Sequence, residues 1–183
     1  LKMQRTEFDA GAVLRPDFLK HLVHDAMKYE AAGIHERVLL SFTTDPYHPG
    51  DTSATRQTIQ VLQNCGMSVT ILTKGGGRSH RDIDLFRPGQ DMYAATLTSC
   101  NSDFSHKWER GAASPWERMR ALHTFHERGI FTWVSLEPVL SVEETLQVVR
   151  ETSRYVDFYK VGKANYITPP EPIDWRKCTV DVT

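Results

Sequence analysis

The chain has 183 residues, of which 40% are hydrophobic and 25% charged, and its formal net charge at pH 7 is −1. This composition is ordinary for one globular core, and the near-neutral charge points to neither a nucleic acid nor a membrane as partner. No apolar run approaches the roughly 18 residues of a spanning helix, and no signal-peptide pattern is present. We therefore expect a cytoplasmic, single-domain protein over residues 1–183.

Five apolar segments, each followed by a small polar cluster, are predicted to be β-strands. They cover residues 38–42, 69–72, 93–97, 131–134 and 158–161, and residues 2–8 are a possible sixth strand. The gap after each strand has room for one helix. This alternation predicts right-handed βαβ crossovers and a parallel sheet.

Helix start and stop signals fall in these gaps. Ser114 is the clearest start, because Pro115 suits the first helical position and Glu117 can reach back to the cap. Ser141 and Glu144 form a second predicted capping box. Other predicted helices run from 16 to a stop at 33, from 51 to a stop at 66, and over 81–86, and the helix after Ser114 stops at 129.

Two architectures agree with alternating strands and helices. An open doubly wound sheet would carry a glycine-rich nucleotide loop after its first strand, but Gly75, Gly76 and Gly77 follow a middle strand without GxGxxG spacing. A barrel-type α/β fold fits better. Five or six strands are fewer than the eight of a closed barrel, so the predicted fold is a partial TIM-like barrel.

Polar side chains follow the predicted strands, and in parallel α/β folds the carboxyl ends of the strands face the active site. Asp45 can accept hydrogen bonds from a ligand amine, and Lys74 suits a carboxylate or phosphate. The alternatives are a simple turn and a solvated lysine. The full set of candidate ligand-binding residues is Thr44, Asp45, Lys74, Ser99, Asn101, Glu137 and Asn165.

The other members of this set have competing interpretations. Ser99 and Asn101 offer a hydroxyl and an amide for ribose hydroxyls, and turn formation carries equal weight. Glu137 can hydrogen-bond a ligand hydroxyl or form a structural ion pair with Lys74 or Lys160. No metal ligands are predicted, because the three cysteines are far apart and form no CxxC pair; they are Cys65, Cys100 and Cys178.

Four short sequence motifs resemble those of the radical SAM superfamily and, within it, of the spore photoproduct lyase-like group, and they occur in the family's order and spacing. They are SFTTDPYHP at 41–49, LTK at 72–74, RDIDL at 81–85 and ERGAASPWER at 109–118. The resemblance implies an open (β/α)6 barrel and an iron–sulfur enzyme that, with an electron donor, cleaves S-adenosylmethionine to a 5′-deoxyadenosyl radical. Its substrate is not implied.

The resemblance also implies roles for single residues. Thr44 and Asp45 match positions near the amino group of S-adenosylmethionine, and Lys74 matches a lysine near its carboxylate. Ser99 and Asn101 match the ribose end, and Glu137 and Asn165 match strand ends that border the adenosine or the substrate.

The chain departs from this group in two ways. It contains no CxxxCxxC motif, whose three thiolates hold a [4Fe–4S] cluster, and that loop is expected upstream of residue 2. We therefore expect a fragment that lacks the first strand and the cluster loop and is inactive alone. The hydrogen-donating cysteine of spore photoproduct lyase, expected at 41–43, is also missing, which argues against DNA repair.

Two other functions are compatible with the same residues. One is a lyase of the class I aldolase type, in which Lys74 or Lys160 forms a Schiff base. The other is a cluster-free module that binds a nucleotide or a protein partner. A locally basic loop also keeps nucleic acid among the possible partners; it contains Lys74, Arg78, His80, Arg81 and Arg87.

Overall fold

A computed structural model describes residues 14–40, 44–164, 168–170 and 172–180. In chain order the elements are α2 (Phe18–Ala31), β1 (Arg37–Leu40), α3 (Ser53–Asn64), β2 (Ser68–Thr73), the 3₁₀ helix η1 (Gly76–Leu85), β3 (Met92–Thr96), α4 (Ser102–Trp108), α5 (Pro115–Glu127), β4 (Phe131–Leu136), α6 (Val142–Thr152), β5 (Phe158–Val161) and α7 (Trp175–Val180).

The described strands form one parallel sheet in the order β1-β2-β3-β4-β5. Each strand pairs with the next one along the chain, so the order never reverses as it does in a doubly wound sheet. The five predicted strands are confirmed, and so is the partial TIM-like α/β fold. Residues 41–42 of the first predicted strand and the possible strand at residues 2–8 lie outside the described residues.

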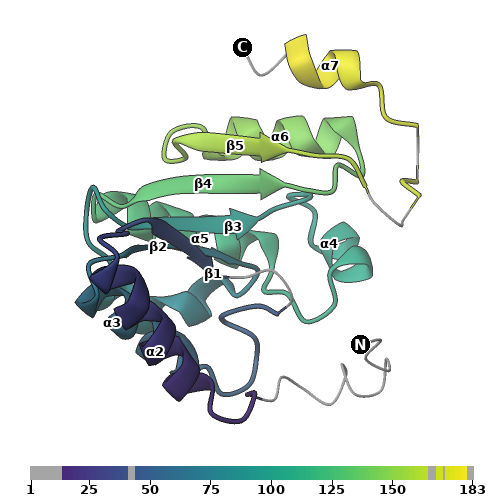
Figure 1. The fold of residues 1–183 in the computed structure, drawn as a ribbon. Helices are drawn as coiled ribbons and strands as arrows, with labels where there is room; N and C mark the ends of the chain where they lie inside the picture. The colour runs from purple at the N-terminus through teal and green to yellow at the C-terminus, as the bar shows by residue number, and fades with distance from the viewer. Residues whose placement is uncertain (1–13, 41–43, 165–167, 171, 181–183) are drawn as a thin grey trace.

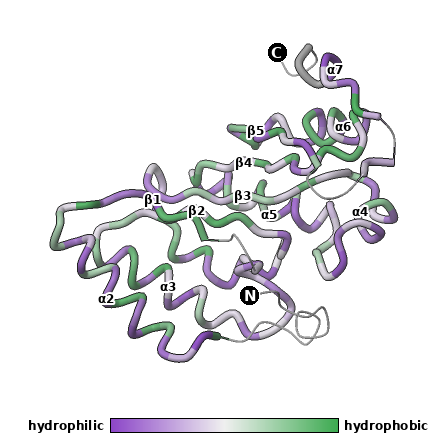
Figure 2. Tube along the Cα trace, turned by 45° about the vertical axis from the view of Figure 1, so that its right-hand side comes forward, coloured by the Kyte–Doolittle hydropathy of each residue, from purple (hydrophilic) through white to green (hydrophobic). Residues whose placement is uncertain are grey.

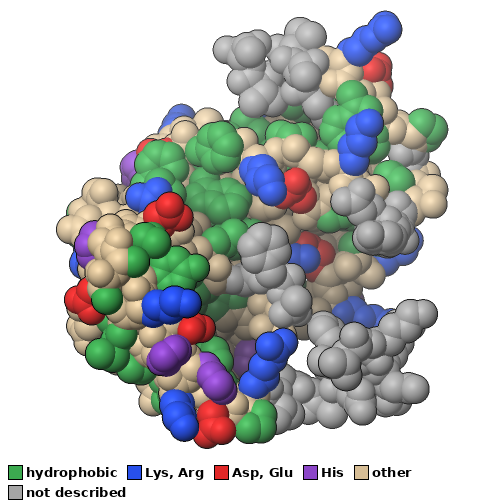
Figure 3. Space-filling view, in the orientation of Figure 1, with side chains coloured by type: hydrophobic (Ala, Val, Ile, Leu, Met, Phe, Trp, Pro, Cys, Tyr) green, Lys and Arg blue, Asp and Glu red, His purple; other side chains and the backbone are tan. Residues whose placement is uncertain are grey.

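The crossover helices α3, α5 and α6 cover one side of this sheet, as right-handed crossovers between neighbouring strands require. Figure 1 shows α5 and α6 behind the strands. Side chains on the opposite, open side are partly exposed: Phe158 is 52% and Phe131 39% exposed, and the ring of Trp133 lies 6.4 Å from that of Phe158. Figure 3 shows hydrophobic side chains gathered over β4 and β5 on this side.

The core lies between the sheet and its helices. Tyr93 of β3 stacks on Phe125 of α5 with ring centroids 3.8 Å apart, and Phe86 meets Phe125 edge-on at 4.8 Å. Inward residues of α3 and α5, including Ile59 and Leu122, are fully buried. Hydrophobic and hydrophilic segments alternate along α2 and α3 in Figure 2, as amphipathic helices require.

The capping prediction for α5 is confirmed, and that for α6 is half right. Ser114 accepts from the Glu117 backbone N–H while Glu117 accepts from Ser114. Ser141 likewise caps α6, but the Glu144 carboxylate accepts from Ser99 instead of reaching back to Ser141. The predicted helix at 81–86 is the end of the longer η1, and α4 and α7 were not predicted.

No helix in the described part of the chain combines the length and the apolar character needed to cross a membrane.

Candidate functional site

Asp45 joins the loop after β1 to the end of β2. Its carboxylate accepts hydrogen bonds from the backbone N–H of Tyr47 at 2.8 Å, from the Thr73 hydroxyl at 2.5 Å and from the Lys74 backbone N–H at 2.6 Å. Thr44 lies beside it on the exposed side of the loop. A carboxylate offers about four acceptor positions, so one remains for a ligand donor.

Lys74 follows β2 and is held at three points. Its backbone N–H donates to Asp45, its carbonyl accepts from the Ala113 N–H at 2.9 Å, and its Nζ lies 3.0 Å from Glu109 Oε1. The side chain is still 38% exposed. Lys74 is therefore a fixed cation at the carboxyl edge of the sheet and not the freely solvated lysine of the alternative reading.

Glu109, between α4 and α5, lies at the centre of a buried ionic cluster. Its Oε2 lies 2.8 Å from a terminal nitrogen of Arg118 and accepts from the Ser105 hydroxyl at 3.0 Å. Burial alone would raise the pKa of Glu109, but the Arg118 guanidinium and the Lys74 ammonium outweigh it, and the pKa is lowered. Glu109 is thus a carboxylate at neutral pH.

Arg118 of α5 is fully buried and anchors this cluster to the sheet. It donates to the carbonyl of Thr96, the last residue of β3, at 2.6 Å and to the Ser105 hydroxyl at 2.6 Å. A continuous polar path therefore runs from the end of β3 through Arg118 and Glu109 to Lys74. Sequence analysis gave neither Glu109 nor Arg118 a role.

Ser99 and Asn101 are occupied by structural hydrogen bonds. Ser99 is fully buried and donates to Glu144 of α6, and its oxygen accepts from the Asn101 N–H at 2.7 Å. Asn101 is the N-cap of α4, where its side chain accepts from the N–H groups of Asp103 and Phe104. Asn101 thus has the local structural role that was the alternative to ligand binding, and its contact with a ribose stays a prediction.

Glu137 forms the structural ion pair that was weighed against ligand binding. Its Oε2 lies 2.9 Å from Lys160 Nζ and accepts from the Ser135 hydroxyl at 3.2 Å. A Cβ at Gly162 would meet the Glu137 carboxylate, so the glycine makes room for this side chain. Asn165 lies outside the described residues.

The predicted site residues fall into three groups along the carboxyl edge. Asp45 is bonded to Lys74, Ser99 to Asn101, and Glu137 to Lys160, in the order of their strands. The first and third groups both combine an exposed lysine with a carboxylate, and in the first group the backbone of the lysine is held as well, by Asp45 and Ala113.

The arginines of the predicted basic loop donate inward. Arg78 bonds the Tyr47 carbonyl at 2.7 Å, Arg81 bonds Thr52 at 3.0 Å, and Arg87 bonds the buried Asp91 at 2.9 Å. These contacts favour a structural role for the three guanidinium groups, and a nucleic-acid partner stays a prediction.

The described residues do not fit a [4Fe–4S] cluster. Cys65 and Cys100 are buried, and burial raises the pKa of Cys65 and raises that of Cys100 to about 11, which disfavours thiolates. Within residues 14–40, 44–164, 168–170 and 172–180 no three His, Cys, Asp or Glu side chains are grouped to hold a metal.

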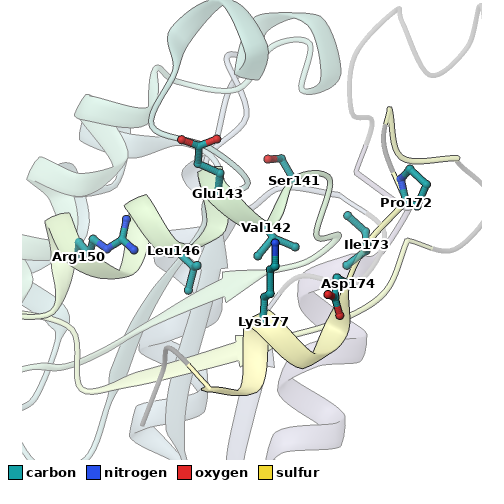
Figure 4. Close-up of a pocket in the computed structure, with 9 residues that line it drawn as sticks. All are labelled: Ser141, Val142, Glu143, Leu146, Arg150, Pro172, Ile173, Asp174 and Lys177. Atoms are coloured by element: carbon teal, nitrogen blue, oxygen red, sulfur yellow. The ribbon is translucent and has the colours of Figure 1, made fainter.

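A separate groove of about 400 Å³ lies between α6 and α7. Figure 4 shows Arg150 and Lys177 extending from the two helices beside it, with Glu143 at the start of α6. None of the predicted site residues lines it.

No protein-family model and no curated protein sequence matches this chain. Three solved structures of SuiB from Streptococcus suis do. SuiB alone aligns at 13% identity with a TM-score of 0.65, over 90% of this chain and 39% of SuiB. SuiB bound to S-adenosylmethionine aligns at 11% identity with a TM-score of 0.67, over 93% of this chain and 40% of SuiB. SuiB bound to precursor peptide SuiA aligns at 12% identity with a TM-score of 0.66, over 92% of this chain and 39% of SuiB.

This chain has the fold of part of SuiB. It spans about two fifths of the length of the SuiB chains that it matches. At these identities the likeness concerns the fold.

Proposed function

We propose that the carboxyl edge of β1 and β2 binds the amino-acid end of S-adenosylmethionine. Lys74 faces the ligand carboxylate, and Asp45, with Thr44, faces its amino group. The observation that carries the proposal is the three-point fixation of Lys74 beside Asp45. The sequence resemblance and the fold shared with S-adenosylmethionine-bound SuiB support the same ligand.

Lys74→Met is expected to weaken binding of S-adenosylhomocysteine at least tenfold, because the methionine keeps most of the length of the side chain but removes its charge. Binding of 5′-methylthioadenosine, which lacks the amino-acid end, is expected to change less than twofold. Isothermal titration calorimetry of the full chain measures both affinities.

Lys20→Met, at an exposed lysine of α2, is the matched control and is expected to bind both ligands as the wild type does. If Lys74→Met weakened the binding of both ligands equally, or of neither, the result would contradict this assignment.

We further propose that the complete protein is a radical SAM enzyme of the spore photoproduct lyase-like group. Since the cysteines of this chain do not supply three cluster ligands, the [4Fe–4S] cluster and the electron donor would act with a segment that supplies a CxxxCxxC motif. Sequencing the coding DNA upstream of Leu1 tests this: an in-frame CxxxCxxC supports it, whereas a start codon without that motif favours a cluster-free binding module.

The aldolase alternative predicts a reactive amine on Lys74 or Lys160. A Schiff base forms from the neutral amine, whereas both lysines lie against carboxylates as ion pairs, with Glu109 and Glu137. We therefore expect borohydride treatment with small aldehydes to leave no specific adduct on either lysine by mass spectrometry. A stoichiometric reduced adduct on one of them would establish the aldolase reading instead.

A further inference from the structure

We infer that Glu109 and Arg118 are a charge-balanced positioning pair: Glu109 holds the Lys74 ammonium in place, and Arg118 neutralises Glu109 so that the charge of Lys74 stays available to an anionic ligand. The identity of that ligand as the carboxylate of S-adenosylmethionine rests on the proposed function.

The positioning role follows from the contacts of the segment between α4 and α5. Glu109 approaches the Lys74 ammonium at 3.0 Å, and four residues later the Ala113 N–H donates to the Lys74 carbonyl at 2.9 Å. The same short segment thus holds both ends of the lysine. Glu109 itself is fixed, because it is 7% exposed and bonded to Ser105 and Arg118.

The balancing role follows from the signs of the charges. A lone carboxylate 3.0 Å from the ammonium would cancel most of its field at a ligand, since both charges would act from nearly the same point. Arg118 supplies the missing positive charge from the buried side, at 2.8 Å from Glu109 and with no exposure to solvent. The Glu109–Arg118 pair is then neutral as a unit.

The charges that remain match an α-amino acid. With Glu109 and Arg118 paired, Lys74 contributes one positive charge and Asp45 one negative charge, and the two residues are joined through a 2.6 Å hydrogen bond. A ligand with an ammonium and a carboxylate on one carbon complements this arrangement. Without Arg118, two carboxylates would face one cation and the site would repel the carboxylate of the ligand.

Glu109→Gln tests the positioning role, with Glu127→Gln on the exposed side of α5 as a matched control. Nuclear magnetic resonance of the ¹⁵N-labelled full chain reports the Lys74 ammonium, assigned by its loss in Lys74→Met. We expect slowly exchanging ammonium protons in the wild type and in Glu127→Gln. In Glu109→Gln we expect exchange as fast as that of the exposed Lys20.

Calorimetry gives the second measurement. In the double variant Glu109→Gln/Arg118→Met, which removes the anchor of Lys74 without changing the net charge of the site, the preference for S-adenosylhomocysteine over 5′-methylthioadenosine is expected to fall about tenfold, whereas a purely structural defect would weaken both ligands equally. Far-ultraviolet circular dichroism confirms that each variant is folded.

The two proposals fail separately. If the wild-type Lys74 ammonium exchanges as fast as that of Lys20, the positioning role is overturned, whichever ligands bind and even if Glu109→Gln does not fold. If the ammonium is protected but wild-type protein binds neither ligand, the positioning role stands and the proposed S-adenosylmethionine site falls.

Discussion

Replacing Arg118 with methionine is expected to lower the free energy of unfolding by about 3 to 5 kcal/mol, the range found when one member of a buried ion pair is removed. The guanidinium is fully buried and bonded to Glu109, Ser105 and the Thr96 carbonyl. Methionine fills similar space but leaves the Glu109 carboxylate with only the half-exposed Lys74 as a cationic partner.

Urea unfolding followed by circular dichroism measures the change from the transition midpoint at constant slope. Arg120→Met, at an exposed arginine two residues away on α5, is the control and should stay within about 0.5 kcal/mol of the wild type. The double variant Arg118→Met/Glu109→Gln should recover part of the loss, because it no longer buries a poorly compensated charge. A single variant as stable as Arg120→Met would show that the buried pair contributes little.

Asp91→Asn is expected to destabilise the fold by about 3 kcal/mol at pH 7, because it removes a buried charge from a network of charged and neutral donors. Asp91, just before β3, is 1% exposed. Its carboxylate accepts from the backbone N–H groups of Val69 and Arg87, from the Arg87 guanidinium and from the Gln63 amide. An asparagine amide nitrogen would face some of these donors.

The pH dependence of this effect has a definite sign. Burial would raise the pKa of Asp91, but the hydrogen bonds from Arg87 and from the Val69 N–H outweigh it, and the pKa in the folded state is lowered. The unfolded chain therefore binds the proton more readily. The contribution of Asp91 is complete above the unfolded pKa of about 3.9 and is lost as the pH falls through the folded value.

Urea midpoints of the wild type and Asp91→Asn at pH 7 and below pH 4 test this assignment. The difference in urea midpoint between the wild type and Asp91→Asn should become smaller in acid. Asp25→Asn, at an exposed position of α2, should have the same urea midpoint as the wild type at either pH. A difference in urea midpoint that stays constant with pH would mean that the shape of the side chain, and not its charge, explains the loss of stability.

The elements of the fold were predictable where the signal is local. Apolar runs located the five strands, and the Ser114–Glu117 capping box located the start of α5, because both depend on residues close in sequence. The helix α4 was missed because its start signal, Asn101, had been considered for ligand binding as well as for a turn, and its seven residues show little periodicity.

The site was less predictable because its charges pair across distant segments. Glu137 was correctly weighed as an ion-pair partner of Lys160, but Lys74 pairs with Glu109, 35 residues away, and Ser99 with Glu144. Arg118 did leave a sequence signal. It shares a helical face with Leu122 and Phe125, and a lone arginine on an apolar face implies a buried anionic partner.

The ion pair between the Lys74 side chain and Glu109 also has an entropic consequence. A free lysine side chain carries about 2 kcal/mol of rotamer entropy, and a ligand that captures a mobile lysine must restrict that freedom when it binds. In this fold Glu109 restricts the Lys74 side chain before any ligand arrives, while Asp45 and Ala113 hold its backbone. Much of the ordering of this cation therefore takes place during folding, which leaves more of the interaction energy with an anion to appear as affinity.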